Sequence, residues 1–252
     1  MRMAALGSGS RGNGLLVEHG DTCLLVDCGF SLRGTVQRLQ ALGRVAEDLS
    51  AILVTHEHSD HIKGVKALSR RYQLPVYMTY GTARHRSVTQ LERRHLIRGQ
   101  DSFDIGDISV QAVTVPHDAS EPCQYVFEAA GQRVGVLTDL GHVTPRVQQS
   151  YSHCDSLFIE SNHDERMLAE GSYPAALKRR VGGNWGHLSN RQTRDFLQGI
   201  CLERLQHLVV GHISEQNNCP DLVAAAMQLP QLGQAQVSLA GQDQILDWIT
   251  ID

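Results

Sequence analysis

Four potential metal ligands lie within six residues in the segment HEHSDH, which spans residues 56–61. His56 and His58 are two residues apart, so an extended chain would direct both imidazoles to the same side. Asp60 and His61 follow where the chain is expected to turn into a helix. Imidazole and carboxylate groups suit zinc, manganese or iron. The segment therefore predicts a metal site, with one ion at the histidine pair and a second ion at Asp60 and His61.

Several apolar runs elsewhere in the chain end directly in a histidine or an aspartate. The run AILVT is followed by His56, VQAVTVP by His117, VGVLT by Asp139 and LVVG by His212. Rigid strands that end at a common sheet edge can aim such side chains at one site. We therefore expect these residues to converge.

The elements that must position these residues alternate between strands and helices. The expected strands, from apolar runs bounded by turn residues, span 15–18, 22–26, 51–55, 108–115, 124–129, 133–138, 156–159, 207–210 and 235–239. The expected helices span 32–42, 62–72, 82–94, 190–200 and 221–228. No internal repeat and no Pro/Gly/Ser-rich linker divides the chain. We therefore expect one domain over residues 1–252.

Composition narrows the classes of protein that the chain can belong to. It has 252 residues, of which 41% are hydrophobic and 20% charged, and a net charge of −4. These values are typical of a globular protein and exclude a histone-like polycation, although a local basic groove is compatible with them. No apolar run is long enough for a membrane span or a signal peptide. The six cysteines are scattered and form no C-x-x-C pair, so we expect reduced thiols and a cytoplasmic protein.

The segment HEHSDH matches the H-x-H-x-D-H signature of the metallo-β-lactamase superfamily. Other segments resemble the remaining motifs of that family in the same order, namely Asp27 in LLVDCG, His117 in TVPHD, Asp139 in VLTDLG and His212 in VVGHISEQNN. The resemblance implies an α/β fold of four layers, an αββα sandwich in which helices flank two mixed β-sheets.

The resemblance also implies two divalent metal ions per chain, zinc or manganese, with iron as a third option. The implied ligands are His56, His58 and His117 for one ion, Asp60, His61 and His212 for the other, and Asp139 as the bridge. Two such ions can share a hydroxide and stabilise a phosphate during displacement. Asp60 could also orient the attacking water, and Asp27 is expected to accept a hydrogen bond from a ligand histidine.

Shorter strings are similar to one branch of the superfamily, the YycJ/WalJ-type hydrolases, bacterial proteins regarded as 5′-to-3′ DNA exonucleases. These strings are SGSRGN at residues 8–13, GHLSN at residues 186–190 and the late GHISEQNN. The interval from Asp139 to His212 is too short for the β-CASP insertion of related RNA-processing enzymes. The resemblance therefore implies a minimal catalytic domain.

Further residues fit a nucleic-acid substrate. Backbone N–H groups of SGSRGN could bind a phosphate, and basic residues from 178 to 194 lie near Trp185 and Tyr173, which could stack on bases. His187 is the best candidate for a group that binds a phosphate oxygen or protonates the leaving alkoxide. The expected substrate-binding residues are Ser8, Ser10, Asn13, His163, Arg179, Arg180 and Asn190. A second basic stretch from Arg84 to Arg98 is better explained by a solvated helix face.

The sequence thus predicts a metal-dependent phosphodiesterase that acts on DNA, single-stranded or at a 5′ end. Superfamily members also hydrolyse β-lactams, thioesters, lactones and sulfates, so the fold does not choose the substrate. A cysteine ligand typical of lactamases is absent at the positions of Asp139 and His212. A thioesterase of the glyoxalase II kind, a cyclic-nucleotide phosphodiesterase and an inactive metal-bearing regulator remain as alternatives. Metal identity, DNA against RNA, polarity and oligomeric state stay open.

Overall fold

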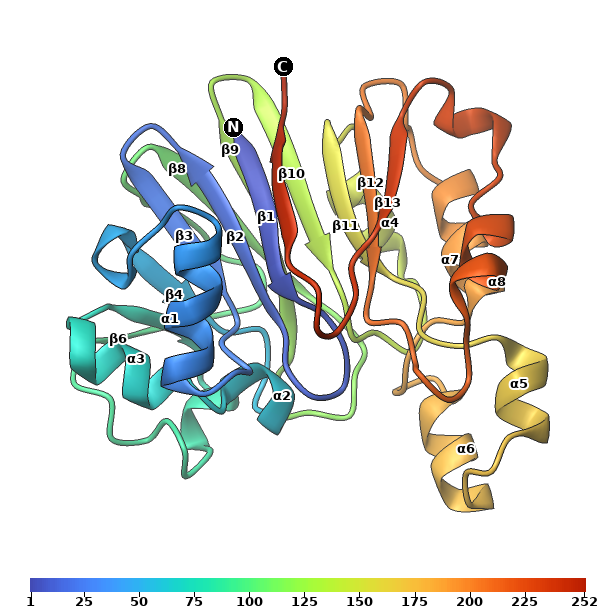
Figure 1. Ribbon diagram of the computed structural model, residues 1–252, viewed down its shortest axis with the longest axis horizontal. Helices are drawn as coiled ribbons and strands as arrows, with labels where there is room; N and C mark the ends of the chain where they lie inside the picture. The colour runs from blue at the N-terminus through green and yellow to red at the C-terminus, as the bar shows by residue number, and fades with distance from the viewer.

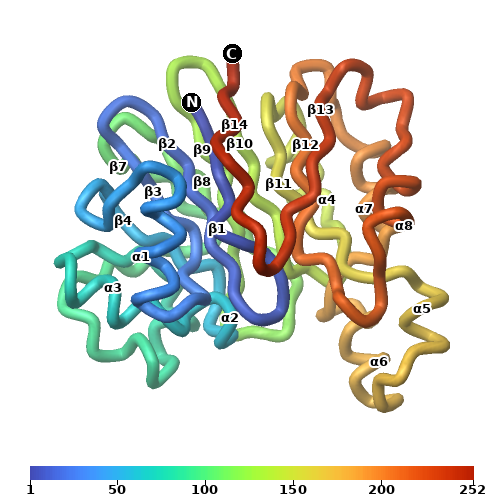
Figure 2. Tube along the Cα trace, viewed as in Figure 1, coloured from blue at the N-terminus to red at the C-terminus, as the bar shows by residue number.

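The computed structural model describes residues 1–252 and contains two seven-stranded β-sheets that pack face to face (Figures 1 and 2). The strands of the first sheet, in spatial order, are β14 (Leu246–Thr250), β1 (Arg2–Gly7), β2 (Gly14–His19), β3 (Thr22–Val26), β4 (Ala51–Leu53), β5 (Val76–Thr79) and β6 (Arg94–Ile97). Those of the second sheet are β13 (Gln236–Leu239), β12 (His207–Gly211), β11 (Ser156–Glu160), β10 (Gln132–Leu137), β9 (Cys123–Ala129), β8 (Ile108–Thr114) and β7 (Ser102–Ile105).

Both sheets are mixed. In the first, β14, β1, β2 and β3 pair antiparallel, and β3, β4, β5 and β6 pair parallel. In the second, β13 to β10 pair parallel, and β10 to β7 pair antiparallel. The hairpin of β2 and β3 turns at Gly20 and Asp21, where Gly20 has a φ of 56° that favours glycine. Each sheet therefore has an antiparallel part, built mainly from hairpins, and a parallel part, whose strands are joined by helical crossovers except between β5 and β6.

The chain contains the helices α1 (Leu32–Ala41), α2 (Ser59–Ile62), α3 (Val65–Tyr72), α4 (Pro145–Tyr151), α5 (Glu165–Glu170), α6 (Ala175–Val181), α7 (Asn190–Gln198) and α8 (Pro220–Ala226). Of these, α1 and α3 cover the outer face of the first sheet and α4, α7 and α8 cover that of the second, whereas α2, α5 and α6 lie at the lower edge in Figure 1. Short 3₁₀ turns are η1 (Ala46–Asp48), η2 (Thr82–Arg84) and η3 (Pro230–Leu232). No helix has the length and apolar surface that a membrane crossing requires.

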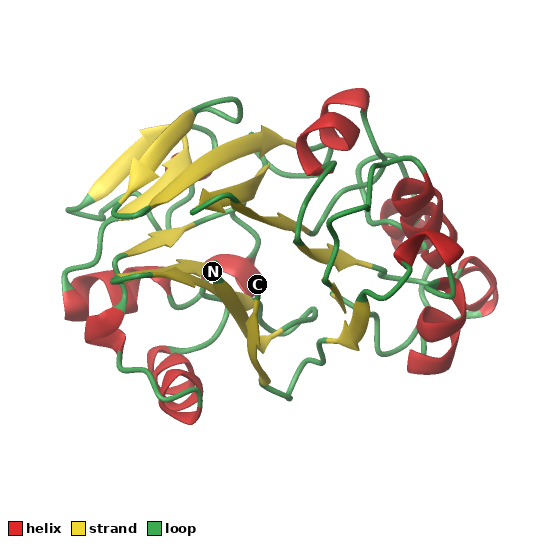
Figure 3. Cartoon of the chain, turned by 90° about the horizontal axis from the view of Figure 1, so that it is seen from above, coloured by secondary structure: helices red, strands yellow, loops and turns green.

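Three hydrophobic clusters define the layers. The largest lies between the sheets and joins side chains such as Val17 and Leu24 of the first sheet to Phe127 and Val209 of the second. A second cluster packs α1 and α3 on the first sheet, and a third packs α4, α7 and α8 on the second. The view from above shows the helices on the outer sides of the two sheets (Figure 3). The predicted four-layer αββα sandwich is confirmed.

The prediction of a helix over residues 82–94 is wrong. The segment contains η2 and then a series of turns before β6. Most of its backbone hydrogen bonds join residues three apart, such as Val88 N–H to His85 and Leu91 N–H to Val88, and a single bond from Thr89 to His85 joins residues four apart. Val88 and Leu91 are its buried apolar anchors, and that spacing fits successive turns as well as it fits a helix. Serine, threonine and histidine in the segment add little intrinsic helix propensity.

Candidate metal centre

Parallel strands from both sheets end at one edge of the sandwich, and polar residues follow there. Asp27 comes after β3, His56 after β4, His117 after β8, Asp139 after β10 and His212 after β12, while Glu160 ends β11. Asp27, Asp139 and His212 have φ values of 60°, 53° and 49°, a left-handed conformation that non-glycine residues rarely adopt. Such conformations cost about 1–3 kcal/mol each and are concentrated at functional sites. The predicted convergence of strand ends is present in the structure.

Three imidazoles form the first group of potential ligands. The ring centroids of His56 and His58 are 4.5 Å apart, and each is 4.9 Å from the ring of His117. Nδ1 of His58 lies 3.2 Å from Nε2 of His117, and the potential ligand atoms of all three lie within 4.8 Å of one another. Nε2 of His58 donates to the carbonyl of Asp118 at 3.2 Å, which leaves Nδ1 free to bind a metal.

The remaining ring nitrogens in this group are held by the protein. Nδ1 of His117 donates to the carbonyl of Gly186 at 2.9 Å, and Nδ1 of His56 lies 2.9 Å from the hydroxyl of Thr55. Nε2 of His56 is buried and has no hydrogen-bond partner. A buried polar atom without a partner is costly, by about 1–3 kcal/mol, and a divalent ion would satisfy it. The first group therefore fits a metal ion of the kind that imidazole prefers.

A second group lies beside the first and contains two carboxylates. Nε2 of His61 is 3.4 Å from a carboxylate oxygen of Asp60 and 3.4 Å from one of Asp139. The same Asp139 oxygen lies 3.0 Å from Nδ1 of His212. Asp139 also falls within 4.8 Å of both His56 and His61, so it borders both groups. The carboxylate of Asp139 is thus close to ligand atoms of both groups.

Asp27 is buried behind the second group. Its carboxylate accepts a hydrogen bond from Nδ1 of His61 at 2.7 Å and two more from the backbone N–H and hydroxyl of Thr55, at 2.9 and 2.8 Å. Thr55 also contacts His56. A carboxylate in this position fixes the ring orientation and leaves Nε2 of His61 facing the site. Asp27 thus contacts a candidate ligand histidine in the manner expected from the sequence.

The two groups differ in electrostatics. Burial, together with the neighbouring His61, holds the pKa of His56 well below its usual range, and burial also lowers the pKa of His117. Burial opposes charge on His212 as well, but Asp139 overrides it and raises the pKa of His212 to about 9. The carboxylates of Asp139 and Asp27 likewise raise the pKa of His61 well above its usual range, against the effect of burial. Without metal, His56 and His117 are therefore neutral at neutral pH, whereas His61 and His212 carry protons.

Metal binding is expected to release protons. A ligand nitrogen must be deprotonated, and at pH 7.5 the metal-free protein holds His61 and His212 in the protonated form. Metal affinity should therefore rise as the pH increases toward 9 and fall below neutrality. Calorimetric titration of metal-free protein with Zn²⁺ in two buffers of different ionisation enthalpy should show release of at least one proton. Metal uptake with no proton release would contradict this ligand assignment.

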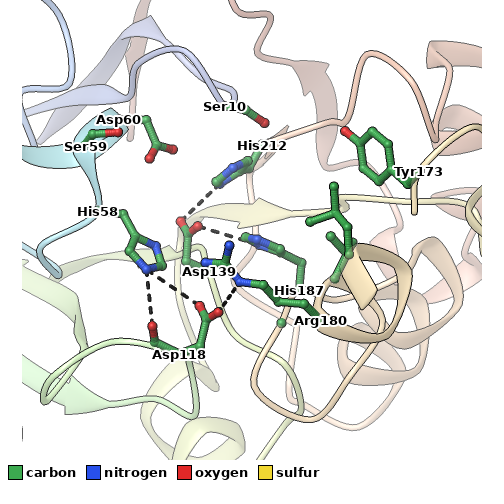
Figure 4. Close-up of a pocket in the computed structure, with 13 residues that line it drawn as sticks. Ser10, His58, Ser59, Asp60, Asp118, Asp139, Tyr173, Arg180, His187 and His212 are labelled. Carbon is green, nitrogen blue, oxygen red and sulfur yellow. Dashed lines mark hydrogen bonds and ion pairs between the residues drawn. The ribbon is translucent and has the colours of Figure 1, made fainter. Parts of the chain in front are cut away.

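An open cavity of about 360 Å³ lies over both groups (Figure 4). Its lining includes His58, Asp60, Asp139, His187 and His212, and only three of its thirteen lining residues are hydrophobic. A polar cavity of this size admits a polar or charged substrate directly to the candidate ligands.

His187 lies at the wall of this cavity and is held by a buried carboxylate. Its Nδ1 lies 3.0 Å from a carboxylate oxygen of Glu160 and 3.6 Å from one of Asp139. The other oxygen of Glu160 accepts backbone N–H bonds from Leu140 at 2.8 Å and Leu188 at 3.2 Å. With Nδ1 occupied, Nε2 of His187 is the nitrogen left to meet a ligand in the cavity.

Arg180 of α6 forms an ion pair with Asp118 across the cavity mouth (Figure 4). Burial opposes the charge on Asp118, but the bond from Arg180 and the nearby His117 together hold its pKa below the usual range. Asp118 also lies 3.7 Å from Nε2 of His58. The pair thus links α6 to the first group of candidate ligands.

The loop SGSRGN packs against the second group of candidate ligands through its first and last positions. The hydroxyl of Ser8 accepts the backbone N–H of His212 at 2.8 Å. The side-chain amide of Asn13 donates to Asp60 at 3.2 Å and lies 3.1 Å from Nε2 of His61. Both residues are buried. Their contacts are with candidate ligands, which favours a positioning role over direct contact with substrate.

Some of the other expected substrate-binding residues line the cavity, and the rest lie outside it. Ser10 lines the cavity, as Arg180 does. Asn190 is buried and exchanges hydrogen bonds with Asn218, while Arg179 is exposed outside the cavity. His163 is buried, has an unpartnered Nδ1 and does not line the cavity. The structure therefore brings Ser10 and Arg180 to the site but not Asn190, Arg179 or His163.

Two residues of the site were missed from the sequence. Glu160 directly follows the strand expected over residues 156–159, and this position at a strand end is the signal that identified Asp139 and His212. Asp118 directly follows His117, and nothing in its local sequence predicts a pair with Arg180, 62 residues away.

Comparison with known proteins assigns the class. The family described as Beta-lactamase superfamily domain matches residues 22–213. The chain is 36% identical over 240 residues to the exodeoxyribonuclease YycJ of Bacillus anthracis, covering 92% of this chain and 89% of that protein. The chain therefore belongs to the beta-lactamase superfamily and is a metallo-β-lactamase-fold hydrolase. It is also 33% identical over 252 residues to the exodeoxyribonuclease WalJ of Streptococcus pneumoniae, covering 98% of this chain and 93% of that one.

Solved structures show the same fold. The metallo-β-lactamase fold protein YhfI from Bacillus subtilis superposes with a TM-score of 0.72 at 16% identity, covering 98% of this chain and 99% of that one. Zn²⁺-bound PqqB from Methylobacterium extorquens superposes with a TM-score of 0.71 at 19% identity, covering 98% and 100%. These similarities extend over nearly all of both chains.

Proposed function

We propose that the protein is a dinuclear metal-dependent nuclease that hydrolyses phosphodiester bonds of DNA, starting from a 5′ end. The observation that carries this proposal is the pair of adjacent ligand groups, bordered by Asp139, beneath an open polar cavity. The exodeoxyribonuclease names of the relatives YycJ and WalJ, similar along nearly the whole chain, support DNA as the substrate.

We assign the two metal ions to the two groups. Zinc or manganese suits their donors, with iron as a third option. The ligands would be His56, His58 and His117 for the first ion, Asp60, His61 and His212 for the second, and Asp139 for both. Bound in this way, a metal pair supplies a nucleophile at neutral pH and compensates the charge of the phosphate. Asp60 lines the cavity and could orient the attacking water.

His187 would donate the proton to the leaving alkoxide. Glu160 is fully buried, accepts a bond from Nδ1 of His187 and so holds the ring with Nε2 toward the cavity. A proton donor needs this combination of a fixed ring and an accessible nitrogen. His187 could also be considered a ligand, because it lies within 4.8 Å of Asp139, Glu160 and His212. We leave it out of the ligand set because seven other residues, namely His56, His58, Asp60, His61, His117, Asp139 and His212, already supply ligands for both ions.

The substrate phosphate would meet Ser10 and Arg180 at the cavity mouth. Arg180 lines the cavity and carries a permanent charge, and its partner Asp118 is partly exposed. A phosphate can replace a carboxylate in a pair with a guanidinium because both present oxygen atoms in a matching plane. Tyr173 lines the same cavity and offers a ring for a base.

A small-molecule hydrolase is the second candidate, and the lining of the cavity disfavours it. A thioesterase would need an apolar surface for its acyl group, whereas three of the thirteen lining residues are hydrophobic. A cyclic-nucleotide phosphodiesterase would share the metal chemistry and differ only in substrate.

A turnover panel tests the proposal. Metal-loaded protein is given a single-stranded DNA, an RNA of the same sequence, a cyclic nucleotide and a glutathione thioester, each with Mn²⁺ and with Zn²⁺. We expect kcat/KM to be highest for DNA and to vanish on chelation. Faster hydrolysis of the thioester or of the cyclic nucleotide would overturn the assignment, and equal rates on RNA would widen it to nucleic acids in general.

We further propose that residues 1–252 form a single catalytic domain without a β-CASP insertion. The core shared by both sheets supports this, because its side chains come from early and late strands alike. A cytoplasmic location is also proposed. All six cysteines are unpaired in the structure, which fits a reducing compartment.

A further inference from the structure

Two adjacent hollows lie beside the active-site cavity, along the edge strand β6 and the β8–β9 loop. The first is about 660 Å³ and is lined by Tyr80, Arg84, Arg94 and Leu96. The second is about 790 Å³ and is lined by Arg98 among others. Both hollows share Tyr80 and Glu121, so they form one continuous surface, which we call the Tyr80 groove.

The Tyr80 groove carries exposed positive charge that has no ion-pair partner within the protein. The segment from residue 84 to residue 98 contains five arginines, and none of them forms an ion pair with the protein. Arg84, Arg94 and Arg98 are exposed. Arg180 at the active site, by contrast, is paired with Asp118. Five unpaired cations on one segment of a chain with a net charge of −4 favour an anionic ligand.

The acidic residues of the groove are already engaged by backbone donors. A carboxylate oxygen of Glu121 accepts the N–H of Gly81 at 2.7 Å, and one of Asp101 accepts the N–H of Arg98 at 2.8 Å. These bonds hold the two carboxylates against the turns that form the floor of the groove. Arg94 donates one hydrogen bond, to the carbonyl of Thr89 at 3.1 Å, and neither carboxylate forms an ion pair with an arginine of the groove, so the guanidinium charges stay available to an external partner.

Exposed apolar side chains accompany the charge. Tyr80 is 53% exposed and Leu96 is 38% exposed, and they are two of the six large hydrophobic residues that the surface exposes. An aromatic ring among unpaired arginines is the combination that proteins use to bind a single-stranded nucleic acid, with bases on the ring and phosphates on the cations.

The β8–β9 loop connects the groove to the active site. Asp118 of this loop lines the active-site cavity, whereas Ser120 and Glu121 line the groove. The N–H of Ser120 donates at 2.7 Å to Glu57, which lies between the candidate ligands His56 and His58. Three residues of extended chain span at most about 11 Å, so a strand of a few nucleotides can occupy both places.

We propose, on the basis of the nuclease function above, that the Tyr80 groove binds the single-stranded part of the nucleic acid beyond the scissile bond. A base stacks on Tyr80, and Arg84, Arg94 and Arg98 bind successive phosphates. The groove therefore increases the affinity for long strands. It does not affect the affinity for a dinucleotide, which is too short to extend beyond the active-site cavity.

Two measurements on the metal-loaded protein test this role. The first compares kcat/KM on a dinucleotide and on a 20-nucleotide single-stranded DNA. The second is the affinity, from fluorescence anisotropy, for a phosphorothioate-linked strand of 20 nucleotides, which resists hydrolysis. The variants are Tyr80→Ala, Tyr80→Phe and the double variant Arg84→Ala/Arg94→Ala. Arg33→Ala on α1 is the matched control, because Arg33 is exposed, has no ion pair and lies outside the groove.

We expect Tyr80→Ala to lower affinity and kcat/KM for the long strand about fivefold or more, and Tyr80→Phe to restore both. The double arginine variant should make the slope of log affinity against log salt shallower by about 1.4, or about 0.7 per lost phosphate contact. Turnover of the dinucleotide and all properties of Arg33→Ala should stay at the wild-type level.

The groove assignment would be overturned if the Tyr80 and arginine variants lost kcat/KM equally on the dinucleotide and on the 20-nucleotide strand, or if their affinity for the long strand were unchanged. Either result would leave the nuclease function intact. A wild-type protein that binds the long strand through these residues but hydrolyses neither substrate would instead overturn the nuclease function alone. Binding of the long strand that is insensitive to salt in every variant would show that the groove serves a different partner.

Discussion

Replacement of His58 or Asp139 by alanine is expected to abolish turnover. Nδ1 of His58 lies 3.2 Å from Nε2 of His117, so the first group loses a ligand when His58 is removed. Asp139 contacts both His61 and His212 and borders the first group. Loss of a hydrogen-bond partner behind a ligand already costs about 10–100-fold in metal affinity or activity. Loss of a ligand itself should therefore exceed that range.

The two variants should differ in metal content. His58→Ala should retain the ion of the second group, whereas Asp139→Ala should weaken both. Elemental analysis after gel filtration, alongside turnover on DNA, distinguishes them. His19→Ala is the control, because His19 lies in the β2–β3 hairpin, away from the strand ends of the site. Full activity of either variant would refute its assignment as a ligand.

Replacement of His187 by alanine is expected to lower kcat by about 10²–10⁴-fold and to leave the metal content unchanged. His187 borders the cavity, and its Nδ1 is held by Glu160 at 3.0 Å. The loss should fall on kcat more than on KM, because proton donation to the leaving group occurs in the transition state. A substrate with a leaving group of low pKa, such as a p-nitrophenyl phosphodiester, should be much less affected.

Glu160→Gln tests the positioning of His187 separately. The amide keeps the size of the side chain but removes the carboxylate oxygen that holds Nδ1 of His187, so kcat should fall while the metal content stays at the wild-type level. His142→Ala is the matched control, since His142 bonds to the nearby carbonyl of Asn184 and does not line the cavity. Loss of metal in His187→Ala would show that His187 is a ligand and that the proton donor must be sought elsewhere.

The strand-end pattern made most of the candidate site predictable. His117, Asp139 and His212 each follow an apolar run, and parallel strands from one sandwich end at a common edge. The candidate ligands of segment 56–61 lie at the same edge because β4 ends just before the segment and α2 begins within it. These features depend on local periodicity, which a sequence displays directly.

The contacts around the site were less predictable because they join distant segments. Asp118 pairs with Arg180, and Glu160 holds His187, 27 residues further along the chain. Neither partner carries a local signal that selects it over other charged residues. Asn190 shows the converse case. Its place beside His187 in the sequence suggested substrate contact, yet it begins α7 and bonds to Asn218 inside the protein.

The turns over residues 82–94 show why secondary structure could not be predicted correctly in every segment. Two apolar anchors three residues apart fit a helix or a pair of turns, and tertiary packing decides between them. Val88 and Leu91 pack into the cluster beneath α1 and α3, and the arginines around them face outward. The exposed charge in this segment therefore belongs to an irregular surface, the Tyr80 groove, and not to a solvated helix face.

We expect DNA hydrolysis by this protein to require two metal ions per chain, and a metal titration of turnover tests this most directly. Metal-free protein at known concentration receives Mn²⁺ or Zn²⁺ in steps, and hydrolysis of a 5′-labelled single-stranded DNA is followed at each step. We predict no activity without metal, a rise that levels off near two equivalents per chain, and early release of a short labelled product. A plateau at one equivalent, or metal-loaded protein that leaves the DNA intact, would contradict the account.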